Sequence, residues 1–480
     1  MSPLAKAAAS GTKWVAISQA GRMTAQVLGM VILARLLSPP DFGIVAMAAM
    51  VTGFAAIFRD LGTVAAVIQK RDLPPPLLSS VFWLNVGIGT AIAILLAVLA
   101  PFVALAMREP RLTEVLQLLA FAFPIVSLGL VQQALLERAS CFRSVALIEC
   151  CAALAGLSTA VLAALAGWGV YSLVFQTIVT WTVVTAGLWA ASSWRPGRQC
   201  SIGQLRELAS FSGNLVGFNT FNYFARNMDT VLIGRFLGAT DLGYYNVAYR
   251  LMLWPLQNIS WVVGRALFPT LSRLQDDRQR LRQGYIRAVA AVFLITAPLT
   301  VGLFVLREPF VAAALGERWH TVADLLFWLA PVSVAQSVAT TGGWLYLSTG
   351  RTDLMFKVGG VSGLAVICAF LIGLRWGVEG VAAAYCITSL ILFWPALAIP
   401  FRLVGLSLAR FLRHLAPTLF AACLMAVLVA VVASESASSA IPLWQRLVLL
   451  AAFGAATYLV VSIVVQRPLL KDVTNALWPR

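Results

Sequence analysis

The sequence predicts an all-α polytopic membrane protein with about fourteen transmembrane helices. Of its 480 residues, 60% are hydrophobic and only 11% are charged, whereas soluble domains carry about 25% charged residues. Apolar stretches of about 20 residues, which is the length that crosses a hydrocarbon core, recur along the chain. This composition excludes a soluble enzyme, a disordered chain and a disulfide-rich secreted domain, and it disfavours a membrane β-barrel, whose strands read as short alternating segments.

The spans follow from the lengths of the apolar stretches and the breakers between them. We interpret the first as an uncleaved membrane helix and not a signal peptide, because Gln19, Arg22 and Gln26 interrupt its apolar run. Connections such as Ser38-Pro39-Pro40 are short, so no extramembrane domain is expected. The predicted spans are 14–37, 41–59, 77–106, 111–136, 143–167, 169–193, 208–235, 241–268, 284–306, 320–347, 353–374, 377–400, 409–433 and 443–466.

The basic residues predict the orientation. With a cytoplasmic N-terminus, 25 of the 35 lysines and arginines fall in inner segments and 8 in outer ones, which is the bias of cytoplasmic loops. We therefore expect both termini in the cytoplasm, and we attribute the net charge of +16 to topology and not to nucleic-acid binding. The seven cysteines form no CxxC pair, the two histidines are too few for a metal site, and no phosphate-binding loop is present. The sequence thus predicts no metal, no cofactor and no enzymatic activity.

Two segments of the chain resemble each other at an offset of 200 residues. Arginine, leucine, aspartate and glycine align between 35–43 and 235–243, and Trp168-Gly169-Val170 matches Trp376-Gly377-Val378. Chance similarity of apolar helices is the alternative, but the matches include charged and turn residues. The pattern predicts two parallel six-helix repeats related by an axis along the membrane normal, plus two C-terminal helices. The predicted divisions are an N-terminal lobe 1–204, a C-terminal lobe 205–404 and an extra two-helix segment 405–480.

The repeated unit predicts a pair of helical hairpins. Its arginines lie at the outer ends of their spans, and its aspartates precede a helix, where a carboxylate can accept amide hydrogens. A structural role is the favoured interpretation, and closure of an outer gate is the alternative. The unit consists of Arg35, Asp41, Gly43, Arg235, Asp241 and Gly243.

The seventh span carries polar residues on one helical face, spaced three, four and three apart. An arginine at membrane depth costs about 2.5–3.5 kcal/mol on insertion scales, so Arg226 is expected to face a wet cavity or a partner. A structural pair with Asp229 is the alternative to a substrate-facing wall. At the 200-residue offset Arg22 matches Asn222 and Gln26 matches Arg226, which predicts two opposed polar faces. The predicted cleft comprises Arg22, Gln26, Asn219, Asn222, Arg226, Asp229 and Arg250.

A family resemblance lies in the hairpin motifs. The run Leu33–Gly43, followed by Asp60-Leu61-Gly62 and Gln69-Lys70-Arg71, resembles the first hairpin of bacterial polysaccharide flippases of the colanic-acid and O-antigen exporter type. The run Asp241–Ala248 also resembles that family, which belongs to the multidrug/oligosaccharidyl-lipid/polysaccharide superfamily. The resemblance implies export of undecaprenyl-pyrophosphate-linked oligosaccharide across the inner membrane by alternating access. It implies the lipid-linked oligosaccharide and membrane lipids as partners, with polysaccharide polymerase or assembly proteins as further candidates.

Two other functions remain open at the level of sequence. A cation-coupled drug antiporter of the same superfamily typically uses carboxylates in its cavity, whereas the deep charges here are mainly cationic. A membrane polysaccharide ligase or polymerase would be expected to have a sizeable outer loop, and the outer connections here are short. A pyrophosphate headgroup, in contrast, suits the planar fork of arginine.

Overall fold

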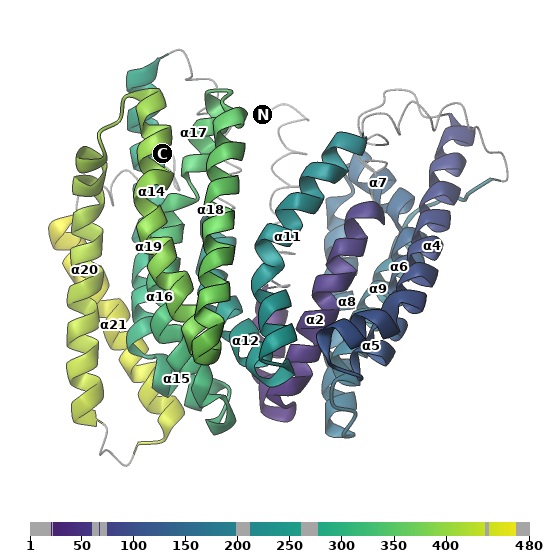
Figure 1. Ribbon diagram of the computed structural model, residues 1–480, viewed down its shortest axis with the longest axis horizontal. Coiled ribbons are helices and arrows are strands. Elements are labelled where there is room, and N and C mark those ends of the chain that lie inside the picture. The colour runs from purple at the N-terminus through teal and green to yellow at the C-terminus, as the bar shows by residue number, and fades with distance from the viewer. Residues whose placement is uncertain are drawn as a thin grey trace. The chain divides into compact units, whose positions relative to one another are not determined.

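A computed structural model of the chain describes residues 21, 23–59, 67, 74–197, 212–260, 277–436 and 441–466 (Figure 1). The secondary structure within these ranges is helical, with no β-strand. Large apolar side chains are exposed along the helices, such as Leu105 at 79% and Val464 at 67%. Exposure on this scale suits hydrocarbon, where such side chains need no shielding from water. The chain is a multi-pass membrane protein.

The contacts divide the chain into two units, Met1–Gly243 and Tyr244–Arg480. In the first unit, α2 packs against α4, α5 and α11, and α8 packs along α9. Figure 1 shows α11 beside α2, although about 150 residues separate them in the sequence. The first unit contains helix Met23–Leu36, α2 (Pro39–Arg59), α4 (Pro75–Met107), α5 (Leu112–Ala120), α6 (Ala122–Ser127), α7 (Leu130–Arg138), α8 (Phe142–Leu165), α9 (Tyr171–Ala191) and α11 (Ser212–Phe236).

The fourth predicted span is broken into α5, α6 and α7, with a bend of 41° between Leu112–Ser127 and Leu130–Arg138. Pro124 lacks the amide that would bond the Ala120 carbonyl, which accounts for the interruption between α5 and α6. The side chains of α9 supply donors at the break, where Thr185 Oγ1 donates to the Ile125 carbonyl at 2.9 Å and Trp189 Nε1 to the Leu128 carbonyl at 2.8 Å. The break is therefore compensated, as a backbone at membrane depth requires.

The second unit is built around α14, which packs against α16 and α20, while α18 packs along α19 and α20 along α21. Its elements are the greater part of α12 (Ala239–Pro255), the π-helix η1 (Leu256–Ser260), α14 (Arg278–Val305), α15 (Arg307–Ala314), η2 (Glu317–Trp319), α16 (His320–Ala339), α17 (Gly342–Ser348), α18 (Thr352–Gly373), η3 (Leu374–Trp376), α19 (Gly377–Val404), α20 (Leu408–Glu435) and α21 (Leu443–Val465).

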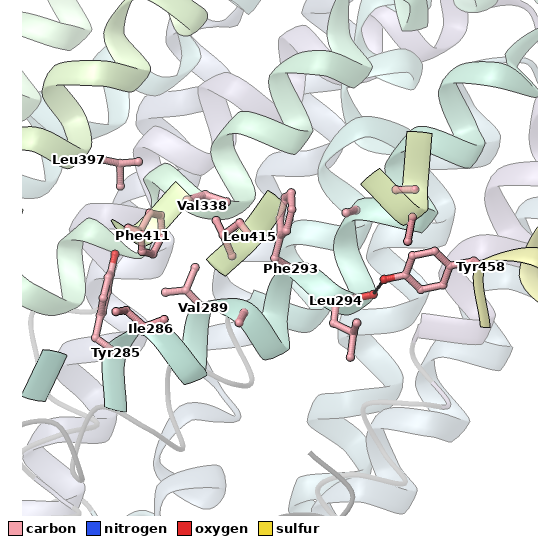
Figure 2. Packing of buried hydrophobic residues seen from close by; sticks show 14 of the residues in the cluster. Tyr285, Ile286, Val289, Phe293, Leu294, Val338, Leu397, Phe411, Leu415 and Tyr458 are labelled. Carbon is pink, nitrogen blue, oxygen red and sulfur yellow. Dashed lines mark hydrogen bonds between the residues drawn. The ribbon is translucent and has the colours of Figure 1, made fainter. Parts of the chain in front are cut away.

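The last two helices, α20 and α21, contribute to the core of the second unit. Figure 2 shows Phe411 and Leu415 of α20 among side chains of α14, α16 and α19. The hydroxyl of Tyr458 on α21 donates to the Leu294 carbonyl on α14 at 2.7 Å. Tyr285 and Phe411 are fully buried in this cluster, where close packing is what holds membrane helices together. This packing joins the C-terminal pair to the helices before it.

Each of the fourteen predicted spans overlaps a helix of the structure. Nine stretches in the described residues are long and apolar enough to cross a membrane, or ten if the bent pair forms one span, and one of the nine, Thr352–Val404, holds both α18 and α19. The count of fourteen therefore stays a prediction, as do the lobe boundaries after 204 and 404. Part of the first predicted span, 14–20, and the end of the eighth, 261–268, lie outside the described residues.

Candidate functional site

The first hairpin turn is held by Asp41. Its carboxylate oxygen Oδ2 accepts hydrogen bonds from the Ser38 amide at 2.9 Å and from the Ser38 hydroxyl at 2.6 Å, and the side chain is buried at 8% exposure. The expectation that Asp41 precedes the helix is wrong, because α2 begins at Pro39 and Asp41 lies in its first turn. The carboxylate reaches back to the amide before the helix, as the acidic residue of a capping box does. Asp41 therefore has a structural role in the turn.

The second hairpin turn repeats the backbone but not the side-chain bonds. The Leu37 amide donates to the Leu33 carbonyl at 2.8 Å, and at the 200-residue offset the Leu237 amide donates to the Ile233 carbonyl at the same distance. Asp241 lies in the first turn of α12, so the expectation that it precedes a helix is again wrong, and its side chain is half-buried. Gly238 stands where the first hairpin has Ser38 and supplies no hydroxyl.

The arginines of the two hairpins lie near the C-termini of their helices, as the sequence predicts, while their place on the outer side stays a prediction. Arg35 is the penultimate residue of helix Met23–Leu36, and Arg235 is the penultimate residue of α11. A cation near a helix C-terminus is stabilised by the helix dipole. Arg35 is exposed, whereas Arg235 is half-buried and its guanidinium carbon lies 6.0 Å from the centre of the Phe236 ring.

The two turns contact each other through their glycines. A Cβ atom on Gly43 would overlap the carbonyl oxygen of Ala239, and a Cβ atom on Gly243 would overlap the carbonyl oxygen of Pro39. Adding 200 to Gly43 gives Gly243, and subtracting 200 from Ala239 gives Pro39, so the repeat converts one contact into the other. A pair of contacts across a two-fold axis has this property. The hairpins therefore meet in a reciprocal contact that only glycine permits at both positions.

Helix α11 is attached to α2 by Tyr223. Its hydroxyl donates to the Met50 carbonyl at 2.7 Å and occupies the space that a side chain on Gly53 would need. Phe54 lies on the same side, with ring centroids 6.2 Å from Tyr223 and 4.9 Å from Phe224. This attachment fixes the rotation of α11 and so decides which of its polar residues are exposed.

Arg226 and Asp229 lie in different environments on α11. Arg226 is exposed, whereas Asp229 is buried at 5% exposure and its Oδ1 accepts the Thr230 amide at 2.7 Å. The ion pairs among the described residues do not include one between Arg226 and Asp229. Residues three apart share one face of a helix, so this spacing alone does not separate the two side chains. Arg226 lies on an accessible face of α11, and its pairing with Asp229 stays an alternative prediction.

The other predicted cleft residues fall in three groups. Gln26, the repeat equivalent of Arg226, is exposed on helix Met23–Leu36 as Arg226 is on α11. Arg22 lies outside the described residues, as do the side chains of Asn219 and Asn222. Arg250 belongs to the second unit, where it is exposed on α12, while Met252 on the same helix is buried and its carbonyl accepts the Ser333 hydroxyl at 2.9 Å.

Sequence reasoning missed three of these features. Ser38 stands three residues before Asp41, which is the spacing of a capping box and was available in the sequence. The contact of Gly43 with Ala239 and the bond from Tyr223 to Met50 have no local signal, because both join residues more than 170 positions apart. Among the described residues, no group of three or more histidine, cysteine or acidic side chains could hold a metal ion.

Comparison with known proteins places these hairpins in a wider group. A family model described as "Polysaccharide biosynthesis protein" matches residues 32–324. The lipopolysaccharide biosynthesis protein WzxC of Escherichia coli (strain K12) is 27% identical over 389 residues, which cover 80% of this chain and 78% of that protein. The succinoglycan biosynthesis transport protein ExoT of Rhizobium meliloti (strain 1021) is 31% identical over 326 residues, which cover 68% and 66%.

Two solved structures share the fold. The lipid II flippase MurJ in an inward closed conformation matches with a TM-score of 0.73 and 15% identity, over 95% of this chain and 99% of that one. An inward-facing multidrug resistance MATE family transporter of the MOP superfamily matches with a TM-score of 0.65 and 14% identity, over 80% and 94%. The all-α transporter fold expected from the sequence is confirmed, and so is the resemblance to polysaccharide flippases.

Proposed function

The chain belongs to the polysaccharide biosynthesis protein family, and from this premise we propose that it is a flippase for lipid-linked oligosaccharide. It moves an undecaprenyl-pyrophosphate-linked precursor from the cytoplasmic to the periplasmic leaflet of the bacterial inner membrane. It acts as a transporter and not as an enzyme. The names of its relatives, among them a succinoglycan transport protein, support this substrate class.

The observation that carries the mechanism is the reciprocal hairpin contact. The two repeat-related turns meet backbone to backbone at Gly43 and Gly243, and a packing contact of this kind can open and close as a unit. Alternating access requires such a closure at one end of the transport path. The contact therefore serves as the outer gate, formed once from each repeat, while the bonds between Asp41 and Ser38 keep the first turn rigid as the gate moves.

Arg226 is the central residue of the proposed translocation path. It is an exposed cation on α11, and Tyr223 fixes the rotation that exposes it. A guanidinium group binds phosphate oxygens through two parallel hydrogen bonds, so it suits a pyrophosphate headgroup. The other members of this path are Arg22, Gln26, Asn219, Asn222, Asp229 and Arg250.

Both termini lie in the cytoplasm in this proposal. Reporter fusions after residues 108, 235 and 307 are expected to report the periplasm, and fusions after 71, 198 and 280 the cytoplasm. Inversion at all six positions would contradict the orientation and with it the direction of transport.

The function is tested by deleting the gene in its host and measuring the leaflet in which labelled lipid-linked oligosaccharide accumulates. We expect accumulation in the cytoplasmic leaflet and loss of surface polysaccharide, both restored by the wild-type gene but not by Arg226→Ala. A deletion strain that keeps its polysaccharide and instead becomes sensitive to cationic dyes would favour the drug antiporter. Chain elongation that stops while flipping continues would favour the polymerase.

A further inference from the structure

A second cationic site lies in the first unit, at the end of α4 and beside the second hairpin turn. A cavity of about 200 Å³ is lined by residues 107–109 at the end of α4 and by residues 234–239, from the end of α11 to the start of α12. Its charged side chains are Arg108, Arg235 and Glu109. The volume equals that of several water molecules at about 30 Å³ each, so it admits a group of five or so non-hydrogen atoms.

One guanidinium nitrogen of Arg235, Nη1, is buried without a hydrogen-bond partner among the described residues. Buried donors in proteins are paired in the great majority of cases, and a charged donor is the most costly to leave unpaired. The two arginines and Glu109 give the cavity walls a formal excess of one positive charge, and no ion pair of the described residues joins Glu109 to either arginine.

Arg108 shows a second peculiarity of the same cavity. It ends α4 in the left-handed conformation, with φ 56° and ψ 32°, and its amide bonds the Leu105 carbonyl at 3.2 Å. Glycine is the usual residue in this conformation because it has no Cβ atom. An arginine here places a cation at the cavity at some conformational cost, which is typical of positions kept for binding.

We propose that this cavity binds a phosphate group between Arg108 and Arg235. Arg108 follows the apolar stretch of α4, which is long enough to cross a membrane, and lipid headgroups begin where such a stretch ends. Arg235, the penultimate residue of α11, lines the same cavity. The first amides of α12, from Ala239 onward, add partial positive charge on the same side. The phosphate comes either from a membrane phospholipid or from a soluble or substrate pyrophosphate. The site is distinct from Arg226, so it stands whether or not the proposed transport path is correct.

The test uses the full chain purified in a maltoside detergent, which contains no phosphate. One arm titrates inorganic pyrophosphate, and the other adds phosphatidylglycerol to the micelles, while the thermal unfolding midpoint is recorded. We expect stabilisation in at least one arm: in the lipid arm alone if the source is a headgroup, and in the pyrophosphate arm if the source is soluble. Stabilisation in neither arm would overturn the proposal.

Variants connect the binding to the cavity. Arg235→Gln and Arg108→Gln should each weaken the apparent affinity at least about tenfold, since a charge-assisted hydrogen bond is lost. Arg111→Gln removes an exposed arginine nearby that does not line the cavity, and it should bind as the wild type does. If Arg235→Gln fails to fold, the exposed Arg108 carries the test alone. Affinities of both cavity variants within twofold of the wild type would disprove the site.

The variant Glu109→Gln distinguishes phosphate binding from an ion pair between Glu109 and Arg235. If the carboxylate competes with the bound phosphate, Glu109→Gln should raise the affinity and leave the unfolding midpoint without ligand nearly unchanged. If Glu109 were itself the partner of Arg235, the same change would lower that midpoint and leave ligand binding no stronger, and the phosphate site would be refuted.

Discussion

The two hairpins of the repeat have the same backbone but differ in how each turn is held. In the first, Ser38-Pro39-Pro40 starts α2 and Asp41 is buried with two hydrogen bonds from Ser38. In the second, Gly238-Ala239-Thr240 replaces this sequence and Asp241 is only half-buried. A proline at the first helical position and a capping side chain both restrict the chain before folding. The difference indicates a rigid first turn and a more adaptable second turn, joined by a contact that is equal from both sides.

The largest loss of stability is expected at Gly43 and Gly243, through which the two hairpin turns contact each other. Gly43→Ala and Gly243→Ala should each destabilise the protein by about 3 kcal/mol or more, because the new methyl group overlaps a backbone carbonyl that cannot rotate away. The thermal unfolding midpoint of purified protein measures this. Gly87→Ala is the control, since a Cβ atom there meets nothing within 4 Å. A loss at Gly43 with none at Gly243 would break the reciprocity of the contact.

The next prediction compares the two helices that precede the turns, helix Met23–Leu36 and α11, by their contributions to glycan export. Arg226→Gln makes α11 like the first helix, where Gln26 holds the equivalent position. It should reduce glycan export at least about tenfold with normal membrane abundance, while Arg226→Lys keeps the charge and recovers only part of the export. Gln26→Ala should have a smaller effect. Low abundance of Arg226→Gln that is restored by adding Asp229→Asn would instead favour a structural pair.

Replacing Asp41 is expected to cost more stability than replacing Asp241, because Asp41 is buried and Asp241 is only half-buried. Asp41→Ala leaves the Ser38 amide and hydroxyl without their acceptor, which should cost about 1–3 kcal/mol. Asp241→Ala should cost about 0.5 kcal/mol, as is usual at partly exposed positions. Chemical unfolding of both variants, with Asp41→Asn as the conservative control, measures the difference. Equal losses would mean that the second turn is as rigid as the first.

The smallest effect concerns the attachment of α11. Tyr223→Phe removes the hydroxyl that bonds the Met50 carbonyl but keeps the ring beside Phe54, so the loss should be about 0.5–1.5 kcal/mol. Unfolding of the variant gives the stability, and cysteine labelling at position 226 reports whether the face of α11 has rotated. An unchanged midpoint together with altered labelling would show that the hydroxyl sets the rotation without contributing stability.

Much of the fold was predictable because each span carries its own signal. An apolar stretch of about 20 residues closes its backbone hydrogen bonds locally, so length and breakers located a helix in each of the fourteen ranges. Arg35 and Arg235 were placed correctly near helix C-termini for the same reason. The broken fourth span was not anticipated, although Pro124 marks it, because its tolerance depends on Thr185 and Trp189 from another helix.

The membrane class, the repeat and the residues chosen for mutation could be predicted from the sequence, because they depend on local hydrophobicity and on direct comparison of the chain with itself. Which of those residues share an environment depends on how the helices pack. The rotation of α11 is set by the bond from its Tyr223 hydroxyl to the Met50 carbonyl of α2, and that rotation exposes Arg226 and buries Asp229. The meeting of Gly43 with Ala239 and of Gly243 with Pro39 depends on backbone approach, which leaves no pattern in a single stretch of sequence beyond the glycines themselves.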